Sequence, residues 1–194
     1  PDGSAVSFSS GTGTLDLNGF DETVLSIAGT CTACYITNSA TGTGTNTLTS
    51  GTTTNTSFAG VVQDGSTAKV ALTKVGSGNL TLSGSNTYTG GTTIKAGAVV
   101  AGSSTAVSVG TGTVTLGDSG GGSNNASFLV SVTGLEYTNA IVLASNTTGT
   151  LALGNTGTAI STTFSGGVTG TNSLTINSNA TTGTITLSTN AINN

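Results

Sequence analysis

The amino-acid sequence predicts an all-β fold, a β-solenoid with essentially no helix. Three observations predict it: apolar residues alternate with Thr, Ser or Asn, Gly and Asn interrupt the alternation, and one short pattern recurs. A period of two gives each strand one apolar and one polar face. Recurring strands of this kind stack into coils that share a core, so residues 1–194 are expected to form a single solenoid domain or a fragment of a longer one.

The alternating segments run along the whole chain and mark its expected strands. They are rich in Thr, Val and Ile, which favour strands, and apolar residues at helical spacing do not persist beyond one turn. Gly and Asn between the segments tolerate the positive φ of tight corners. The segments are residues 14–17, 70–73, 79–82, 113–116, 173–176 and 184–187.

One pattern of small residues followed by two alternating apolar residues recurs at irregular intervals. It occupies residues 10–19, 75–84 and 110–117, with weaker copies at 148–154 and 182–187. At about 20–25 residues per coil, the chain would hold roughly eight or nine coils. Residues 117–125, which contain four glycines, are the expected protruding loop.

The composition excludes several classes of protein. Only 5% of the residues are charged, against roughly 25% in ordinary soluble domains, and a net charge of −4 is too small for typical disorder. Three lysines without any arginine give no basic footprint for nucleic acid. No apolar run approaches the roughly 20 residues that a membrane-spanning helix needs.

The side chains that catalysis needs are also scarce. Without histidine, the chain can form neither a Ser-His-Asp or Cys-His arrangement nor a His-ligated metal site. Glycoside cleavage needs two carboxylates that flank one bond, but adjacent Asp21 and Glu22 would point to opposite faces of a strand. Asp16 and Asp21 could meet across strands, although a solvated turn is the favoured position. We expect no enzyme and no cofactor, with a secreted carbohydrate-active enzyme as the least favoured alternative.

The two cysteines, Cys31 and Cys34, form a Cys-x-x-Cys pair. Such a pair can be a redox centre, half of a zinc site or a local disulfide. The zinc site lacks its other ligands, and no helix pattern follows that would lower a thiol pKa. A short structural disulfide is the favoured interpretation.

Threonine and aromatic residues raise two further alternatives. Alternating threonines at residues 41–49 and 111–115 would suit an ice-binding face, but their spacing is not constant, so the β-propensity of Thr is the favoured explanation. Tyr35, Tyr88 and Tyr137 would be sugar-stacking platforms if exposed, although turn or core-edge positions are favoured. The five phenylalanines are expected to stack inside the coils; they are Phe8, Phe20, Phe58, Phe128 and Phe164.

A longer stretch, residues 76–97, resembles the passenger-associated transport repeat of bacterial autotransporter passenger domains. Its core is the run Asn86, Thr87, Tyr88, Thr89, Gly90, Gly91, Thr92 and Thr93. Residues 15–24 and 58–65 are similar to elements that accompany this repeat, and the resemblance is best over residues 10–117. It implies a right-handed parallel β-helix, export through the outer membrane, and an adhesive or self-associating role.

These observations together predict a non-enzymatic, extracellular structural or adhesive protein on the surface of a Gram-negative cell. We expect it to self-associate through solenoid ends or faces, into surface fibres or cell–cell contacts. The alternative is a ligand-binding module for a host glycan or for ice. Nucleic acid and a membrane-spanning segment are not expected.

Overall fold

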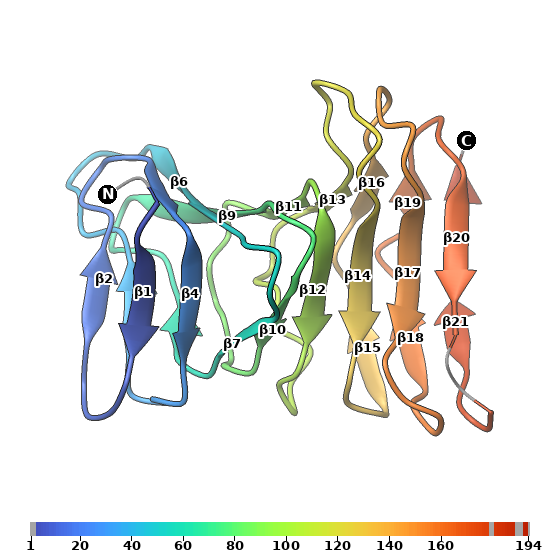
Figure 1. Cartoon of the computed structure of the whole chain (residues 1–194), viewed down its shortest axis with the longest axis horizontal. Coiled ribbons are helices and arrows are strands. Elements are labelled where there is room, and N and C mark those ends of the chain that lie inside the picture. The colour runs from blue at the N-terminus through green and yellow to red at the C-terminus, as the bar shows by residue number, and fades with distance from the viewer. Residues whose placement is uncertain (1–2, 179–180, 189–191, 194) are drawn as a thin grey trace.

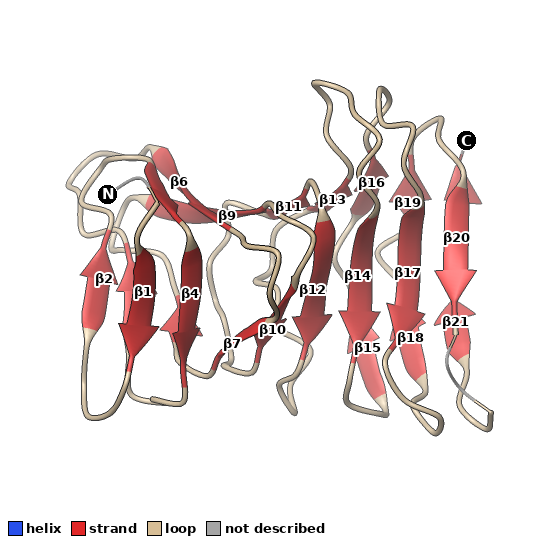
Figure 2. Cartoon of the chain, viewed as in Figure 1, coloured by secondary structure: helices blue, strands red, loops and turns tan. Residues whose placement is uncertain are grey.

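The computed structural model describes residues 3–178, 181–188 and 192–193. Within these residues, 22 strands and no helix are present (Figure 2). No helix in the described ranges is therefore long and apolar enough to cross a membrane. The prediction of an all-β fold is confirmed.

Two long parallel sheets form two sides of the molecule. Each has eight strands, one from each of eight successive coils, and the coils follow one another along the long axis (Figure 1). Sheet 1 contains β1 (Ala5–Phe8), β4 (Ser26–Gly29), β7 (Thr56–Phe58), β10 (Asn79–Leu82), β12 (Gly97–Ala101), β14 (Ala126–Val130), β17 (Leu151–Asn155) and β20 (Leu174–Asn177). Sheet 2 contains β3 (Glu22–Val24), β6 (Thr45–Ser50), β9 (Lys69–Lys74), β11 (Thr92–Ile94), β13 (Val114–Leu116), β16 (Ile141–Leu143), β19 (Val168–Thr169) and β22 (Ile192–Asn193).

The third side of the solenoid, side 3, is interrupted. One three-stranded sheet belongs to coils 1–3, and another belongs to coils 6–8. Coils 4 and 5 cross this side through residues 83–91 and 102–113, which form no strand. The strands of side 3 are β2 (Thr14–Asp16), β5 (Tyr35–Thr37), β8 (Val61–Val62), β15 (Leu135–Tyr137), β18 (Thr162–Phe164) and β21 (Ile185–Leu187).

The coils differ in length although they stack in register. On sheet 1, Leu80 pairs with Val99, 19 residues further along the chain. Val99 pairs in turn with Phe128, 29 residues further along. Part of this difference lies in residues 117–125, which connect β13 to β14 and extend beyond the neighbouring coils (Figure 1). The eight coils agree with the predicted number, and the parallel β-solenoid is confirmed.

Alternate residues of each strand point inward and form the core. Side chains of successive coils lie above one another, as in the buried column of Leu80, Val99, Phe128 and Leu153 on sheet 1. The ring of Phe128 also contacts the ring of Tyr137, at 5.2 Å between centroids. One narrow core therefore runs continuously through the coils, as stacked repeats require.

Four of the five phenylalanines are buried as predicted, but Phe20 is not. Phe20 is 67% exposed, because it follows a tight turn in which Asn18 and Gly19 have φ angles of 45° and 88°. The turn closes through a hydrogen bond from the Phe20 amide to the Leu17 carbonyl. An aromatic residue beside a turn of this kind leaves the coil, so its prediction as a core residue was wrong.

Candidate functional site

The predicted repeat core crosses side 3 of coil 4, where the strands are missing, and then enters β11. Its side chains still alternate: Asn86, Tyr88 and Thr92 are buried, whereas Thr87 and Thr89 are exposed. The backbone here forms no strand, although single backbone hydrogen bonds still reach the adjacent coils, from the Thr87 amide to the Val62 carbonyl and from the Thr111 amide to the Tyr88 carbonyl. The buried polar side chains add further hydrogen bonds between the coils, because buried backbone groups without a strand partner need other partners.

The buried amide of Asn86 connects three coils. Its Oδ1 accepts a hydrogen bond from the Val62 amide of coil 3 at 2.7 Å, and its Nδ2 donates to the Ser108 carbonyl of coil 5 at 2.5 Å. An amide side chain suits this place because it carries both a donor and an acceptor. Asn86 thus supplements the backbone hydrogen bonds that its own amide and the Thr87 amide form with coils 5 and 3.

The hydroxyl groups of Tyr88 and Thr92 continue this arrangement inside the coil. Thr92 Oγ1 donates to the Val109 carbonyl of coil 5 at 3.0 Å, and Tyr88 Oη lies 2.6 Å from Thr92 Oγ1. Because the Thr92 proton is already used, Tyr88 is the donor in this second bond. Burial raises the pKa of Tyr88, and the hydrogen bond with Thr92 opposes this rise only in part, so the phenol stays protonated.

Asp64 of coil 3 accepts hydrogen bonds at the exposed edge of the same corner. Its Oδ1 accepts a hydrogen bond from the Val70 amide at 2.8 Å. Its Oδ2 accepts from the Thr89 hydroxyl at 2.6 Å and from the Thr89 amide at 3.1 Å. Gly90 follows directly, where a Cβ atom would lie only 2.4 Å from the Val70 carbonyl oxygen. Glycine is required there because the two coils approach so closely.

Lys74, like Asp64, is a residue of this region that sequence reasoning did not assign to the site. It is only 2% exposed, and its ammonium group donates to the carbonyls of Val75, Gly76 and Ala96 at 2.7, 2.8 and 3.2 Å. Burial lowers the pKa of Lys74 to about 8. The signal was present in the alternation of β9, where Val70 and Leu72 occupy inward places and a lysine takes the next one.

Asp16 and Asp21 both accept hydrogen bonds from the adjacent coil 2. Asp16 accepts hydrogen bonds from the amide and the hydroxyl of Ser39 in coil 2. These bonds hold the pKa of Asp16 below its usual value, and the bond from the hydroxyl has the larger effect. Asp21 accepts from the Thr47 amide at 2.8 Å. Asp16 and Asp21 therefore use different partners, and the described residues contain no group of three Cys, Asp or Glu side chains that could hold a metal ion.

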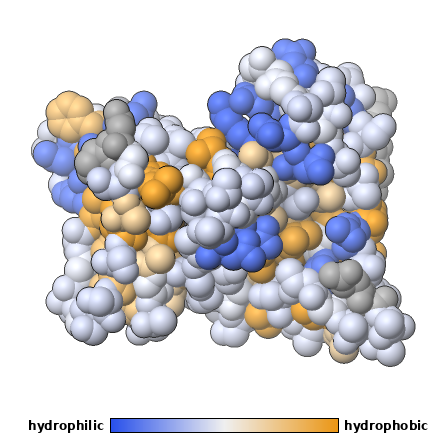
Figure 3. Space-filling view, viewed as in Figure 1, coloured by the Kyte–Doolittle hydropathy of each residue, from blue (hydrophilic) through white to orange (hydrophobic). Residues whose placement is uncertain are grey.

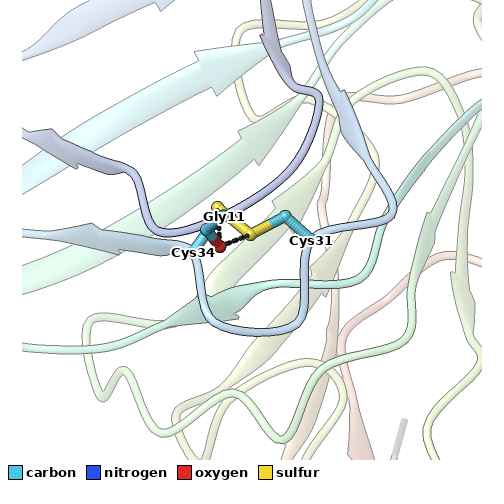
Figure 4. Close-up of a disulfide and its surroundings, with 3 residues drawn as sticks. All are labelled: Gly11, Cys31 and Cys34. Atoms are coloured by element: carbon cyan, nitrogen blue, oxygen red, sulfur yellow. Dashed lines mark hydrogen bonds between the residues drawn. A yellow bond between two sulfur atoms is a disulfide. The ribbon is translucent and has the colours of Figure 1, made fainter.

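Cys31 and Cys34 are joined by a disulfide at the corner between β4 and β5 (Figure 4). Cys31 and Cys34 are 7% and 1% exposed, and Cys31 Sγ lies 2.8 Å from the Gly11 carbonyl oxygen of coil 1. An oxidised sulfur carries no proton, so this is a packing contact. A buried disulfide pressed against the adjacent coil has a structural role and is shielded from attacking thiols.

Of the three tyrosines considered for sugar stacking, two are inaccessible, and the most exposed aromatic side chain of the described residues is instead Phe20. Tyr88 and Tyr137 are fully buried, while Tyr35 is 38% exposed. An open pocket of about 420 Å³ lies between residues 147–150 and 172–175, and only Thr, Ser, Asn and Gly line it. This pocket has no aromatic side chain on which a sugar could stack. Glycan binding therefore stays a prediction.

The fold and the site together define a parallel β-solenoid in which side-chain hydrogen bonds secure coils 3–5. Residues 72–101 match the Passenger-associated-transport-repeat family. This range includes Lys74 and the whole of Asn86 to Thr93, so the resemblance of residues 76–97 to the repeat is confirmed. The wider resemblance over residues 10–117, with its elements at 15–24 and 58–65, stays a prediction outside the matched range. Comparisons with curated proteins and with solved structures gave no match.

The hydrogen bonds of Asn86 can be tested by truncation. Asn86→Ala leaves a buried donor on Val62 and a buried acceptor on Ser108 without partners, so we expect the free energy of unfolding in urea to fall by about 2–4 kcal/mol. The matched control is Thr87→Ala at the adjacent exposed position, which should change it by less than about 0.5 kcal/mol. Equal effects of the two changes would contradict the role given to Asn86.

The buried lysine predicts an unusual pH dependence. The pKa of Lys74 in the folded state, about 8, is below the roughly 10.4 of an unfolded lysine. The unfolded chain therefore binds more protons between these values, and stability should rise with pH in this window. We expect the unfolding free energy of the wild type, minus that of Lys74→Met, to increase by about 1–3 kcal/mol between pH 8 and 10. A flat or falling difference would show that the carbonyl groups keep the lysine fully charged.

Proposed function

We propose that this chain is a non-enzymatic extracellular module with a structural and adhesive role, and that it self-associates through the end of its solenoid. The fold and the repeat match fit a passenger-like domain of an autotransporter. Such repeats are associated with secreted passenger domains, which supports a location on the outside of a Gram-negative cell. The viewed surface is mostly of intermediate hydropathy, with separate apolar areas (Figure 3).

The observation that carries the proposal is the exposed core layer of coil 8. Ile176 occupies the inward place that Leu153 occupies one coil earlier, yet Ile176 is 43% exposed, whereas Leu153 is fully buried. Leu187 is likewise half-buried, although its register partner Phe164 is 2% exposed. An apolar layer of this kind favours covering by another strand layer.

The charge distribution supports the same end of the molecule as the site of self-association. No charged residue follows Glu136 in the sequence, so coil 8 carries none of the charges that usually prevent edge strands from pairing. Coil 1 also leaves its inward Val6 and Leu15 only half-buried, but it differs in charge, because it contains Asp16, Asp21 and Glu22. We therefore propose that, in the 194-residue chain, a second copy adds its strands to the edge of coil 8.

A charge at the exposed core layer tests this proposal. Ile176→Lys would place an unpaired ammonium in the contact, so we expect the self-association constant to weaken by about tenfold or more. Thr81→Lys, at an outward position of β10 in coil 4 and so away from the edge strand, is the control and should associate like the wild type. Sedimentation velocity over a range of concentrations measures both. A wild-type chain that remains monomeric, or an equal effect of the two changes, would contradict the proposal.

A further inference from the structure

The first coil of the solenoid has a carboxylate at an inward place of sheet 2. Glu22 is the register partner of the buried Leu48, and it lies on the inward side of its strand, whereas its neighbour Thr23 points outward and is exposed. The members of this column in coils 2–7 are all neutral and buried; they are Leu48, Leu72, Thr92, Val114, Ile141 and Val168. A half-buried carboxylate therefore ends the column at coil 1.

The carboxylate of Glu22 makes coil 1 a poor surface for another coil. A coil stacked there would remove this carboxylate from water, which costs free energy even where the group has a partner. Inward-pointing charges are one of the means by which natural sheets prevent edge pairing. Asp16 and Asp21 add two further negative charges to the same coil. Coil 1 therefore resists stacking, although Leu15 on its side 3 is only half-buried.

The opposite end of the solenoid, coil 8, ends its described inward columns in apolar side chains. Leu174 and Ile176 end two columns of sheet 1, and Ile185 and Leu187 end two columns of side 3. Leu174, Ile185 and Leu187 are half-buried, and Ile176 is exposed. Two such layers can face each other without burying any charge, so coil 8 is complementary to itself.

Two copies of the chain can meet end to end in three ways, and the charges distinguish them. Coil 1 against coil 1 would bring together the Asp16, Asp21 and Glu22 carboxylates of both copies, which repel one another. Coil 1 against coil 8 would press the Glu22 carboxylate onto an apolar layer that offers it no basic side chain, because the last lysine of the sequence is Lys95. Only coil 8 against coil 8 buries apolar side chains and no charge.

We infer that the partner of coil 8 in the 194-residue chain is coil 8 of a second copy, in a closed dimer with two-fold symmetry. This inference rests on the self-association proposed above and adds the orientation of the partner. The symmetry places the two copies of β20 side by side in opposite directions, as in an antiparallel ladder. Both coils 1 remain at the outer ends, so association stops at two copies. Because the copies point in opposite directions, the contact suits molecules that meet from facing cells.

Fluorescence-detected sedimentation of a labelled chain mixed with unlabelled wild type tests this orientation. The dye is attached through Thr81→Cys, at an outward position of β10 in coil 4 and so away from both ends. The labelled chain should sediment as a dimer and as no larger species. The labelled chain that also carries Ile176→Lys should bind wild type at least about tenfold more weakly, because its coil 1 offers no alternative contact. Circular dichroism confirms that each variant is folded.

Glu22→Leu tests the charge that closes coil 1. The change gives coil 1 the same residue that coil 2 has in this column, Leu48, so both ends become apolar and we expect species larger than the dimer. Glu136→Leu makes the same substitution at an exposed outward position of β15 in coil 6 and should leave the dimer unchanged. Equal behaviour of these two variants would contradict the role given to Glu22.

The outcomes separate this inference from the proposed function on which it rests. A wild-type chain that remains monomeric would overturn both. A wild-type chain that grows into open-ended polymers would overturn the inference alone, because coil 1 of one copy would then cover coil 8 of the next. The same conclusion would follow if wild type bound the labelled Ile176→Lys chain as tightly as it binds the labelled chain without this change.

Discussion

Hydrogen bonding between successive coils is the constraint on which the rest of this structure depends. A single coil contributes only a few inward side chains, as β10 does with Leu80 and Leu82, so no coil can bury a core alone. The two eight-stranded sheets bring each backbone into register with the coil before it and the coil after it. The narrow core and the regular outer face both follow from this stacking, because register places equivalent side chains in columns.

Where the regular strands stop, neutral polar side chains and one lysine add hydrogen bonds to the backbone bonds that remain between the coils. Coils 4 and 5 have no strand on side 3, and there Asn86 connects the Val62 amide with the Ser108 carbonyl. The ammonium group of Lys74 similarly donates hydrogen bonds to three carbonyl groups at the corner between sheets 2 and 1. A buried charge without a carboxylate is tolerated because all three ammonium protons have acceptors. The segment that matches the family is thus the segment in which side chains do most to join the coils.

The sequence predicted the strands and their inward faces well, because alternation is a local property. It identified the run from Asn86 to Thr93, but not the partners of these residues, which lie in coils 3 and 5. Lys74 was missed because a lysine at an inward place reads as an exception to the pattern until its carbonyl partners are known. The sequence drew attention to alternating threonines but could not show that Thr23, Thr49, Thr73, Thr93 and Thr115 are register partners on sheet 2. Coil lengths of 19 to 29 residues conceal a spacing that only register makes constant. Phe20 was wrongly placed in the core because the turn at Asn18 is decided by backbone geometry.

The register between coils is the central claim, and cysteine cross-linking tests it most directly. Thr81 in coil 4 pairs with Val100 in coil 5, and Val100 pairs with Leu129 in coil 6. Cysteines at 81 and 100 would be neighbours about 5 Å apart, within the reach of a disulfide, whereas cysteines at 81 and 129 would be about twice as far apart and beyond it. Parallel stacking predicts rapid oxidation of the first pair alone. A disulfide between positions 81 and 129, or none in either variant, would contradict the stacked-coil account.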